Sequence, residues 1–269
     1  MKRLIVVASL VLSACASGGV TPVPMPESDA GAALRGAVSG AIDAQESAVI
    51  ESYRAAITAP RPAEEVARDP HRLPLEMLEF IGLQPGWRIA DIRPEEGYFT
   101  RLFAPVVGPT GQVYAFVPTL TATREQPFAE GLQAEYGNVT PVIGLLDQMS
   151  FDQPLDAVFM GQEYHDFHID RFGVDVAEMN RRVFAALRPG GVYVILDHSG
   201  RPGTGNTEVA SLHRIEGAFL RREIEAAGFI FEAETRVLAN PDDAMDISVF
   251  DESIRGRTDQ FVYRFRKPE

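Results

Sequence analysis

The sequence has few of the features that would cross-link the chain or carry it through a membrane. Its 269 residues include one cysteine, Cys15, so an internal disulfide framework is excluded. The apolar run at residues 4–12 would span about 14 Å as a helix, roughly half of a bilayer core, and is too short for a transmembrane helix. Positive charge is also scarce, because 25 basic residues stand against 38 acidic ones.

The first residues are typical of a bacterial secretory signal. Two basic residues precede the apolar run, and Leu-Ser-Ala-Cys at 12–15 resembles a lipobox. This resemblance makes residues 1–14 a lipoprotein signal and Cys15 the lipidated mature N-terminus. The alternative is that Cys15 is only a small apolar residue inside the signal. Positions 16 and 17 lack the aspartate that marks inner-membrane retention, which favours an anchor on the periplasmic face of the outer membrane.

The charge of the remaining chain excludes one large class of partner. Removal of residues 1–14 deletes Lys2 and Arg3 but no acid, and the formal net charge changes from −13 to −15. A surface this negative repels phosphate backbones, so nucleic acid is not expected as a partner. A small-molecule substrate is expected instead, and contact with a membrane only through the N-terminal lipid.

Composition divides the chain into a tether and one large domain. Residues 15–46 are rich in Ala, Gly, Ser and Pro and are predicted to form a flexible tether with some helix. The rest, residues 47–269, can bury a core of its own, since 45% of the chain is hydrophobic. It begins with a helical extension over residues 48–57, followed by a helix over residues 75–81 that starts at Pro74 and ends at Gly82.

Strand and helix patterns alternate after this extension. Strands are predicted at residues 89–92, 112–117, 139–144, 155–160, 192–197, 230–238 and 261–266, and helices near residues 99–106, 121–136, 174–187 and 212–227. Such alternation implies an α/β fold with a doubly wound, Rossmann-like, mostly parallel sheet that has helices on both faces. The insert at residues 239–259 is interpreted as a solvated acidic loop, with a lid over the site as the alternative.

The stretch from residue 88 to residue 101 is the strand–turn–helix unit that opens such a sheet. Ligands bind in the crevice outside the carboxyl end of this strand, where a glycine-rich turn lets backbone N–H groups approach them. Here Gly97 is the glycine that remains. Pro94, Glu95 and Glu96 fit an ordinary helix start better than a cofactor-binding turn, because proline suits a first turn and carboxylates suit the helix dipole.

Three segments carry a resemblance to a known family. They are "LQPGWRIADI" before the first turn, "GPTGQVYAF" before the second strand, and "LRPGGVYVILDH" into the fifth strand. They resemble class I S-adenosylmethionine-dependent methyltransferases, and residues 249–268 resemble an exported subgroup of predicted bacterial methyltransferases. The resemblance covers about residues 75–267 and implies a seven-stranded sheet whose last strand is antiparallel.

The family's cofactor landmarks are carried over position by position. Asp91 matches the acidic residue that ends the first strand, Gly97 the last glycine of the turn, and Asp147 the aspartate that meets the adenine. The other glycine positions of the turn are replaced, and the side chains of Glu95 and Glu96 are expected to fill space that the cofactor needs. The second strand ends without its usual carboxylate. The sequence therefore predicts that S-adenosylmethionine binding is impaired or altered.

Polar residues follow the fourth and fifth strands, at the ligand-binding edge of the sheet. The candidate catalytic residues are Tyr164, His165, Asp166, His168, Asp197 and His198. Three interpretations stay open. In the first, these residues are solvated loop or capping groups. In the second, either His165 or His198 is a base that a neighbouring aspartate orients. In the third, His165, His168 and His198 bind a metal together with a carboxylate.

Two functions follow from these residues. The first is methyl transfer from S-adenosylmethionine to an unknown small acceptor, a reaction in which positioning supplies most of the rate. The second is a non-catalytic, lipid-anchored protein that uses a retired methyltransferase scaffold to bind another ligand or a metal. In that case the glutamates at 95 and 96 would disfavour an anionic ligand. Export counts against the first function, because S-adenosylmethionine is made in the cytoplasm.

Overall fold

The computed structural model describes residues 29–269, with side chains from Gly40 onward except at positions 42 and 43. The predicted signal peptide, residues 1–14, and the predicted lipidation site, Cys15, lie outside the described residues. Residues 45–269 form one compact unit, and residues 29–44 belong to a second one. No helix within residues 29–269 has both the length and the apolar character needed to cross a membrane.

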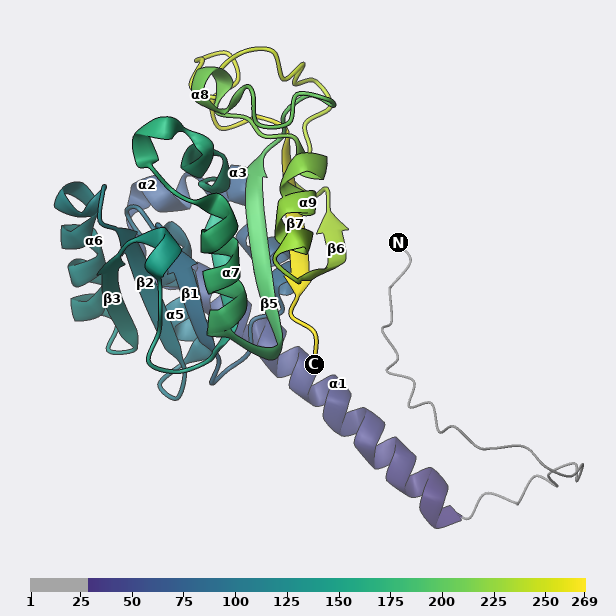
Figure 1. Ribbon diagram of the computed structural model, residues 1–269. Helices are drawn as coiled ribbons and strands as arrows, with labels where there is room; N and C mark the ends of the chain where they lie inside the picture. The colour runs from purple at the N-terminus through teal and green to yellow at the C-terminus, as the bar shows by residue number, and fades with distance from the viewer. Residues whose placement is uncertain (1–28) are drawn as a thin grey trace, which may run out of the picture. The chain divides into compact units, whose positions relative to one another are not determined.

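The centre of the larger unit is one seven-stranded sheet (Figure 1). Its strand order is β3-β2-β1-β4-β5-β7-β6. The strands are β1 (Arg88–Ile92), β2 (Gln112–Pro118), β3 (Val139–Gly144), β4 (Leu155–Gly161), β5 (Leu187–His198), β6 (Ile230–Thr235) and β7 (Gln260–Arg266). Neighbours from β3 to β5 are parallel, whereas β7 is antiparallel to both β5 and β6. The predicted fold class is confirmed.

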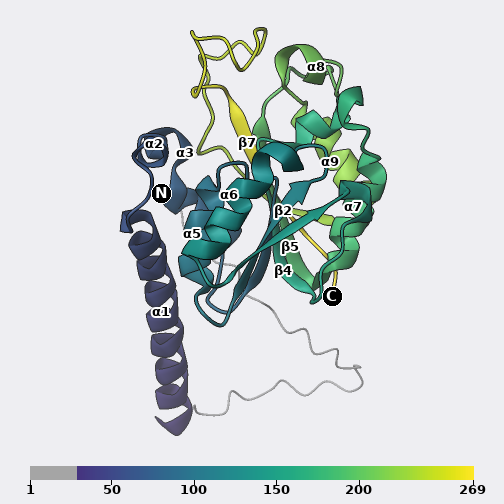
Figure 2. The same ribbon diagram turned by 90° about the vertical axis from the view of Figure 1, so that its left-hand side faces the viewer.

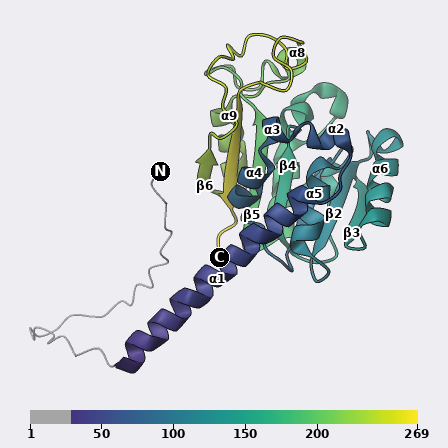
Figure 3. The same cartoon turned by 180° about the vertical axis from the view of Figure 1, so that it is seen from behind.

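Helices cover both faces of the sheet, and each face has its own core. On one face, seen in Figure 3, α4 (Pro74–Ile81), α5 (Tyr98–Val107) and the end of α1 (Asp29–Thr58) pack on the strands. α6 (Ala122–Glu135) joins this core through Ala129 and Leu132. On the other face, α7 (Val176–Ala186) and α9 (Gly217–Ala226) pack around Tyr193 and Phe265. Three short helices, α2 (Ala63–Val66), α3 (Asp69–Arg72) and α8 (Val209–Leu212), and three 3-10 turns, Leu146–Gln148, Tyr164–His168 and Asp170–Phe172, complete the unit.

Several element boundaries differ from the prediction. The helix expected at 48–57 is the end of α1, which begins at Asp29, so helix extends into the segment expected to be a tether. The helix start expected at Pro94 is wrong, because α5 begins at Tyr98 and Gly97 is its N-cap. The strand expected at 192–197 is longer than predicted, because β5 already begins at Leu187.

The helix predicted at residues 212–227 is also wrong as a single helix. The chain leaves α8 at His213, whose φ of 55° is left-handed, and α9 begins at Gly217. Between them, Ile215 lies beside Ser199 in an isolated parallel bridge. This break turns His213 back towards the carboxyl end of β5, a consequence that helical periodicity could not reveal.

The parallel strands place the polar residues on one edge. Ile92 of β1 pairs with Met160 of β4, and Gly161 of β4 pairs with Leu196 of β5, so the three strands end side by side. The strand order reverses between β1 and β4, and such a switch point is where open α/β sheets bind ligands. The insert after β6 and the segment around α8 lie at this same end of the sheet (Figure 2).

The tight turn before α5 gives a first prediction. Gly97 has a φ of 96°, and a Cβ there would lie 2.6 Å from Cδ1 of Leu132 in α6. Gly97→Ala should therefore lower the free energy of unfolding by about 1–3 kcal/mol, through both backbone strain and overpacking. Urea unfolding measures the change. Gly131→Ala is the matched control, since its Cβ would meet no atom within 4 Å, and it should be neutral or stabilising.

Candidate functional site

The turn after β1 keeps the backbone of a glycine-rich loop, although only the last of the three glycine positions is still a glycine. Three alternate positions are left-handed: Arg93 at φ 56°, Glu95 at φ 53° and Gly97 at φ 96°. Two of the three carry side chains, and a side chain in this region costs about 1–2 kcal/mol per residue. Strain of this kind persists only where surrounding contacts hold it.

The contacts of Arg93 explain how this strained turn is held. Its guanidinium lies 3.3 Å from Glu125 of α6 and 3.0 Å from Asp166 after β4, and it also pairs closely with Glu163. All four side chains are buried. Burial acts to lower the pKa of Arg93, but the three carboxylates outweigh it and raise the pKa above its usual value. Arg93 is thus a charged bridge across the switch point.

Arg93 also closes the space beside Asp91. A hollow lined by Asp91, Arg93, Pro94 and Gly161 has a volume of only about 20 Å³, about one water molecule. The sequence predicted that the side chains of Glu95 and Glu96 would fill the crevice. Both glutamates do line this hollow but are exposed, whereas Arg93 lines it as a buried side chain.

Asp91 is buried beneath this turn as a carboxyl group with an unusual pKa. The Thr100 hydroxyl donates a hydrogen bond of 2.7 Å to its Oδ2. Burial raises the pKa of Asp91 to about 7, although the hydrogen bond from Thr100 opposes the shift. Asp91 therefore titrates near neutral pH, which is a property of many acid–base residues.

A much larger cleft lies beside the turn and extends over the ends of β4 and β5. Its volume is about 820 Å³, which is in the range of small-molecule sites. Six arginines outnumber four carboxylates among its lining residues. The lining residues are Arg68, His71, Arg72, Arg93, Glu95, Glu96, Arg124, Gln162, Glu163, His165, Asp166, Arg171, His198, His213, Val249, Phe250, Arg255, Gly256 and Gln260. The glutamates at 95 and 96 were expected to make this region negatively charged. Instead, positive side chains outnumber negative ones in the lining of the cleft.

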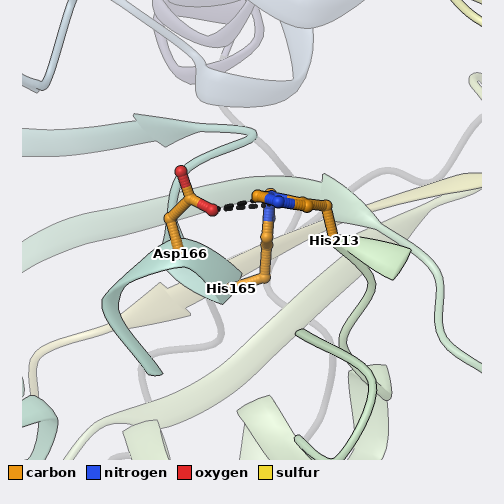
Figure 4. A group of neighbouring side chains, drawn as sticks. All are labelled: His165, Asp166 and His213. Atoms are coloured by element: carbon orange, nitrogen blue, oxygen red, sulfur yellow. Dashed lines mark hydrogen bonds and ion pairs between the residues drawn. The ribbon is translucent and has the colours of Figure 1, made fainter. Parts of the chain in front are cut away.

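Two histidines and an aspartate meet in the wall of this cleft (Figure 4). Nε2 of His165 lies 3.2 Å from Nδ1 of His213, and Oδ1 of Asp166 lies 3.3 Å and 2.8 Å from those two atoms. On its other side, the His165 ring contacts Oδ1 of Asp197 through Nδ1 at 2.7 Å. Asp197 also accepts the backbone N–H groups of His165 and His198.

The charges around these histidines move their pKa values away from neutrality. Burial acts to lower the pKa of His165, but Asp197 and Asp166 outweigh it and raise the pKa to about 10. Burial and the charge of His165 lower the pKa of His198 to about 3. Burial acts to raise the pKa of Asp166, but the two adjacent imidazoles and Arg93 lower it below its usual range. Neither His165 nor His198 therefore titrates near pH 7.

The predicted catalytic residues separate into two groups. His165, Asp166, Asp197 and His198 come together at the cleft, and His198 bonds Thr258 through Nδ1 at 2.8 Å. Tyr164 and His168 instead meet at Glu223 of α9, at 3.1 Å and 2.9 Å, and do not line the cleft. The tyrosine is fully buried and its hydroxyl also accepts a hydrogen bond from Asn180.

The predicted cofactor residues are also dispersed. Asp91 and Gly97 belong to the turn, but Asp147 is half-buried in the 3-10 turn after β3 and does not line the cleft. Sequence reasoning missed the roles of Arg93, Glu125 and Glu163. The sequence signal for Arg93 was its position, because it stands where the family's turn has a glycine and a long charged side chain is unusual there.

The insert after β6 forms part of the cleft instead of lying free in solvent. Its Phe250 packs on the His213 ring, with centroids 4.7 Å apart, and Val249 donates a backbone hydrogen bond to Leu212. One of its aspartates, Asp243, is buried in an ion pair with the fully buried Arg214. The expectation of a solvated acidic loop is therefore wrong for Asp243, whereas Phe250 is exposed despite its contact with His213.

Comparison with known proteins identifies the fold. No protein-family model and no curated protein matches the chain. Among solved structures, a SAM-dependent methyltransferase from Aquifex aeolicus is 18% identical, with a TM-score of 0.53 over 77% of this chain and 99% of that one. A putative sarcosine dimethylglycine methyltransferase from Galdieria sulphuraria is 14% identical, with a TM-score of 0.53 over 74% and 85%.

A third similar structure has a different described activity. The [4+2]-cyclase SpnF is 16% identical, with a TM-score of 0.54 over 74% of this chain and 80% of that one. Similarity at these identities shows that the chain has the class I methyltransferase fold. Function must be argued from the site, because one fold carries many activities.

The buried Asp91 gives a prediction on pH. Its pKa is raised in the folded state, so the folded chain binds more protons than the unfolded chain between about pH 4 and pH 7, and stability falls as pH rises through this window. Asp91→Asn removes this pH-dependent contribution to stability. The free energy of unfolding of the variant, relative to that of the parent chain, should therefore increase by up to about 4 kcal/mol as pH rises from about 4 to about 7. Urea unfolding at several pH values measures it, and a difference that does not change with pH would contradict it.

Proposed function

We propose that this chain is a lipid-anchored protein of the bacterial cell envelope, built on a methyltransferase scaffold, whose cleft binds a small molecule while S-adenosylmethionine binding is impaired or altered. The observation that carries the proposal is the buried Arg93 network. Class I methyltransferases use the space beside the first strand for the methionine part of the cofactor. Here the hollow beside Asp91 has a volume of only about 20 Å³, and it is lined by a charged side chain held by three carboxylates.

The cost of moving Arg93 supports this proposal. Removing one partner from a buried ion pair leaves an uncompensated charge and costs about 3–5 kcal/mol. A ligand that displaced the guanidinium would have to replace its contacts to Glu163, Glu125 and Asp166. The open cleft next to it offers about 820 Å³ without any such displacement.

The cleft has groups that suit a ligand with an anionic part. Arg171 and Arg255 are exposed in its wall, and Arg68 is 3.9 Å from the exposed Glu96. Arginine binds carboxylate and phosphate groups through its planar, forked donors. Arg72 is held differently, through Gln162 at 3.0 Å and the faces of Tyr98 and Phe99. A small acidic molecule fits this lining better than a polyanion, which the net charge of the whole chain would repel.

Methyl transfer to a small acceptor is a second candidate function. It is favoured by the left-handed backbone at all three glycine positions of the turn and by the buried Asp91. If Arg93 moved aside, the turn could still present its N–H groups to a ligand. The positive amino group of S-adenosylmethionine would then meet the carboxylates that Arg93 had left.

Calorimetric titration of the full-length protein in detergent with S-adenosylmethionine distinguishes the two candidates. We expect no saturable binding below millimolar concentration. Arg93→Gly combined with Glu163→Gln should improve binding about tenfold or more. Glycine suits the left-handed φ, and the glutamine removes one buried carboxylate charge that the loss of Arg93 would leave unpaired. Arg171→Ala is the control, an arginine of the same cleft outside the network, and should not improve binding.

One result of this titration would support methyl transfer instead. Micromolar binding by the parent chain that disappears in Asp91→Ala would show a working cofactor site, and Arg93 would then have to be a movable gate. The search would turn to methyl acceptors.

The proposed anchor has its own test. Cys15 lies in the lipobox-like sequence, and Cys15→Ser removes the thiol that would be lipidated while keeping a similar size. In a bacterial host the parent protein should fractionate with the outer membrane and take up a labelled fatty acid, whereas the variant should do neither. Equal membrane association of the two proteins would refute the anchor.

A further inference from the structure

The side chains of His165, Asp166 and His213 form a compact triangle of potential metal ligands, here called the His–Asp–His triangle. Its three facing atoms are Nε2 of His165, Nδ1 of His213 and Oδ1 of Asp166, and the distances between them are 3.2, 3.3 and 2.8 Å. Atoms that bind one metal ion at about 2.0–2.1 Å lie about 2.9–3.4 Å from one another, for angles between 90° and 109°. The triangle has nearly these dimensions.

We propose that the His–Asp–His triangle binds a divalent transition-metal ion, with Zn²⁺ as the reference ion, and leaves open coordination positions towards the cleft. Two imidazoles and one carboxylate are ligands that suit zinc and its neighbours, whereas Mg²⁺ and Ca²⁺ prefer oxygen ligands alone. Three protein ligands with an open position are typical of sites that bind and polarise a substrate or water. This inference goes beyond the proposed function and does not depend on S-adenosylmethionine.

The surroundings of His165 orient it as a metal ligand. Its Nδ1 lies 2.7 Å from Oδ1 of the fully buried Asp197. A histidine whose one nitrogen donates to a carboxylate presents the lone pair of its other nitrogen, and this carboxylate–histidine pairing is the usual support of histidine ligands. Nε2 of His165, 3.3 Å from Oδ1 of Asp166, would bind the ion in place of the proton that it carries in the metal-free chain.

Asp166 is arranged in a matching way. Its Oδ2 accepts a hydrogen bond of 3.0 Å from Arg93, which fixes the carboxylate. Its Oδ1 is buried and meets no donor in hydrogen-bonding geometry within the part of the chain that the structure describes. That oxygen is directed at the two imidazole nitrogens (Figure 4). The Arg93 network that closes the cofactor space therefore also positions a metal ligand.

The third ligand depends on the break between α8 and α9. His213 stands in left-handed conformation at φ 55°, and its ring packs against Phe250 of the insert. This conformation turns a residue more than forty positions after His165 to meet it. The triangle lines the cleft, so a bound ion would be within reach of a small molecule there.

The site differs from the metal site that the sequence suggested. His168 is excluded from it because its Nε2 lies 2.9 Å from Glu223 and its Nδ1 lies 3.2 Å from Asn206, away from the cleft. His198 lines the cleft, but its ring centroid is 5.8 Å from that of His165 and its Nδ1 contacts Thr258. His213 replaces them as the second imidazole.

The test is a metal titration of the full-length protein in detergent, without a histidine tag and after treatment with a chelator. Calorimetry with Zn²⁺ should show one saturable site of micromolar affinity or tighter, and Mg²⁺ should show none. Co²⁺ should give visible absorption bands typical of nitrogen and oxygen ligands. Both signals should weaken about a hundredfold or more in His213→Asn and in Asp166→Asn, since ligand loss exceeds the 10- to 100-fold cost of losing a supporting residue.

The variants are chosen to separate ligand loss from unfolding. Asparagine tolerates the left-handed conformation at position 213, so His213→Asn removes the imidazole with little backbone strain. His71→Ala is the matched control, an exposed histidine of the same cleft outside the triangle, and should bind Zn²⁺ as the parent does. Circular dichroism of each metal-free variant checks the fold.

Asp197→Asn tests the supporting residue and should weaken Zn²⁺ binding about 10- to 100-fold without abolishing the Co²⁺ bands. The proposal is overturned if the parent chain binds no Zn²⁺ at millimolar concentration. It is equally overturned if His213→Asn and Asp166→Asn, shown to be folded, bind Zn²⁺ like the parent. The absence of Zn²⁺ binding would not change the expected result of the S-adenosylmethionine titration. Likewise, binding of S-adenosylmethionine would not decide whether the triangle binds a metal.

Discussion

The buried guanidinium of Arg93 is the interaction on which the site depends. It joins the turn after β1 to α6 and to the segment after β4, and it holds a strained backbone that would otherwise favour glycine. A buried ion pair is weak evidence for added stability, but removing one partner is costly. The network therefore acts as a constraint: once these four charged side chains are buried together, the space beside Asp91 stays closed and Asp166 stays oriented.

The same constraint links the two proposals. The buried salt bridge lies beside the turn after β1, and the larger open volume lies over the ends of β4 and β5. There Asp166 receives Arg93 on one oxygen and faces two imidazoles with the other. The carboxyl ends of the parallel strands form a crevice in such a sheet, and the open cleft lies there.

The fold could be predicted nearly in full because its signals are local and repeated. Apolar strand patterns, the proline and glycine limits of α4, and the alternation of strands with helices all act over short stretches of chain, and β1 to β7 fall within a few residues of their expected places. The errors share a cause. The α5 start at Tyr98 in place of Pro94, and the break at His213, are decided by contacts with Leu132, Phe250 and β5 that no local pattern records.

The sequence by itself determined the class of fold, the edge of the sheet that carries the site, and the gathering of His165, Asp166, Asp197 and His198 there, since parallel strands always bring their carboxyl ends together. Only the tertiary structure decided what each residue does at that edge. It placed Tyr164 and His168 at Glu223, brought His213 to His165, and paired Arg93 with three carboxylates. These outcomes depend on side-chain directions and on charges that meet across long separations in the chain, and such pairings exist only once the core has packed.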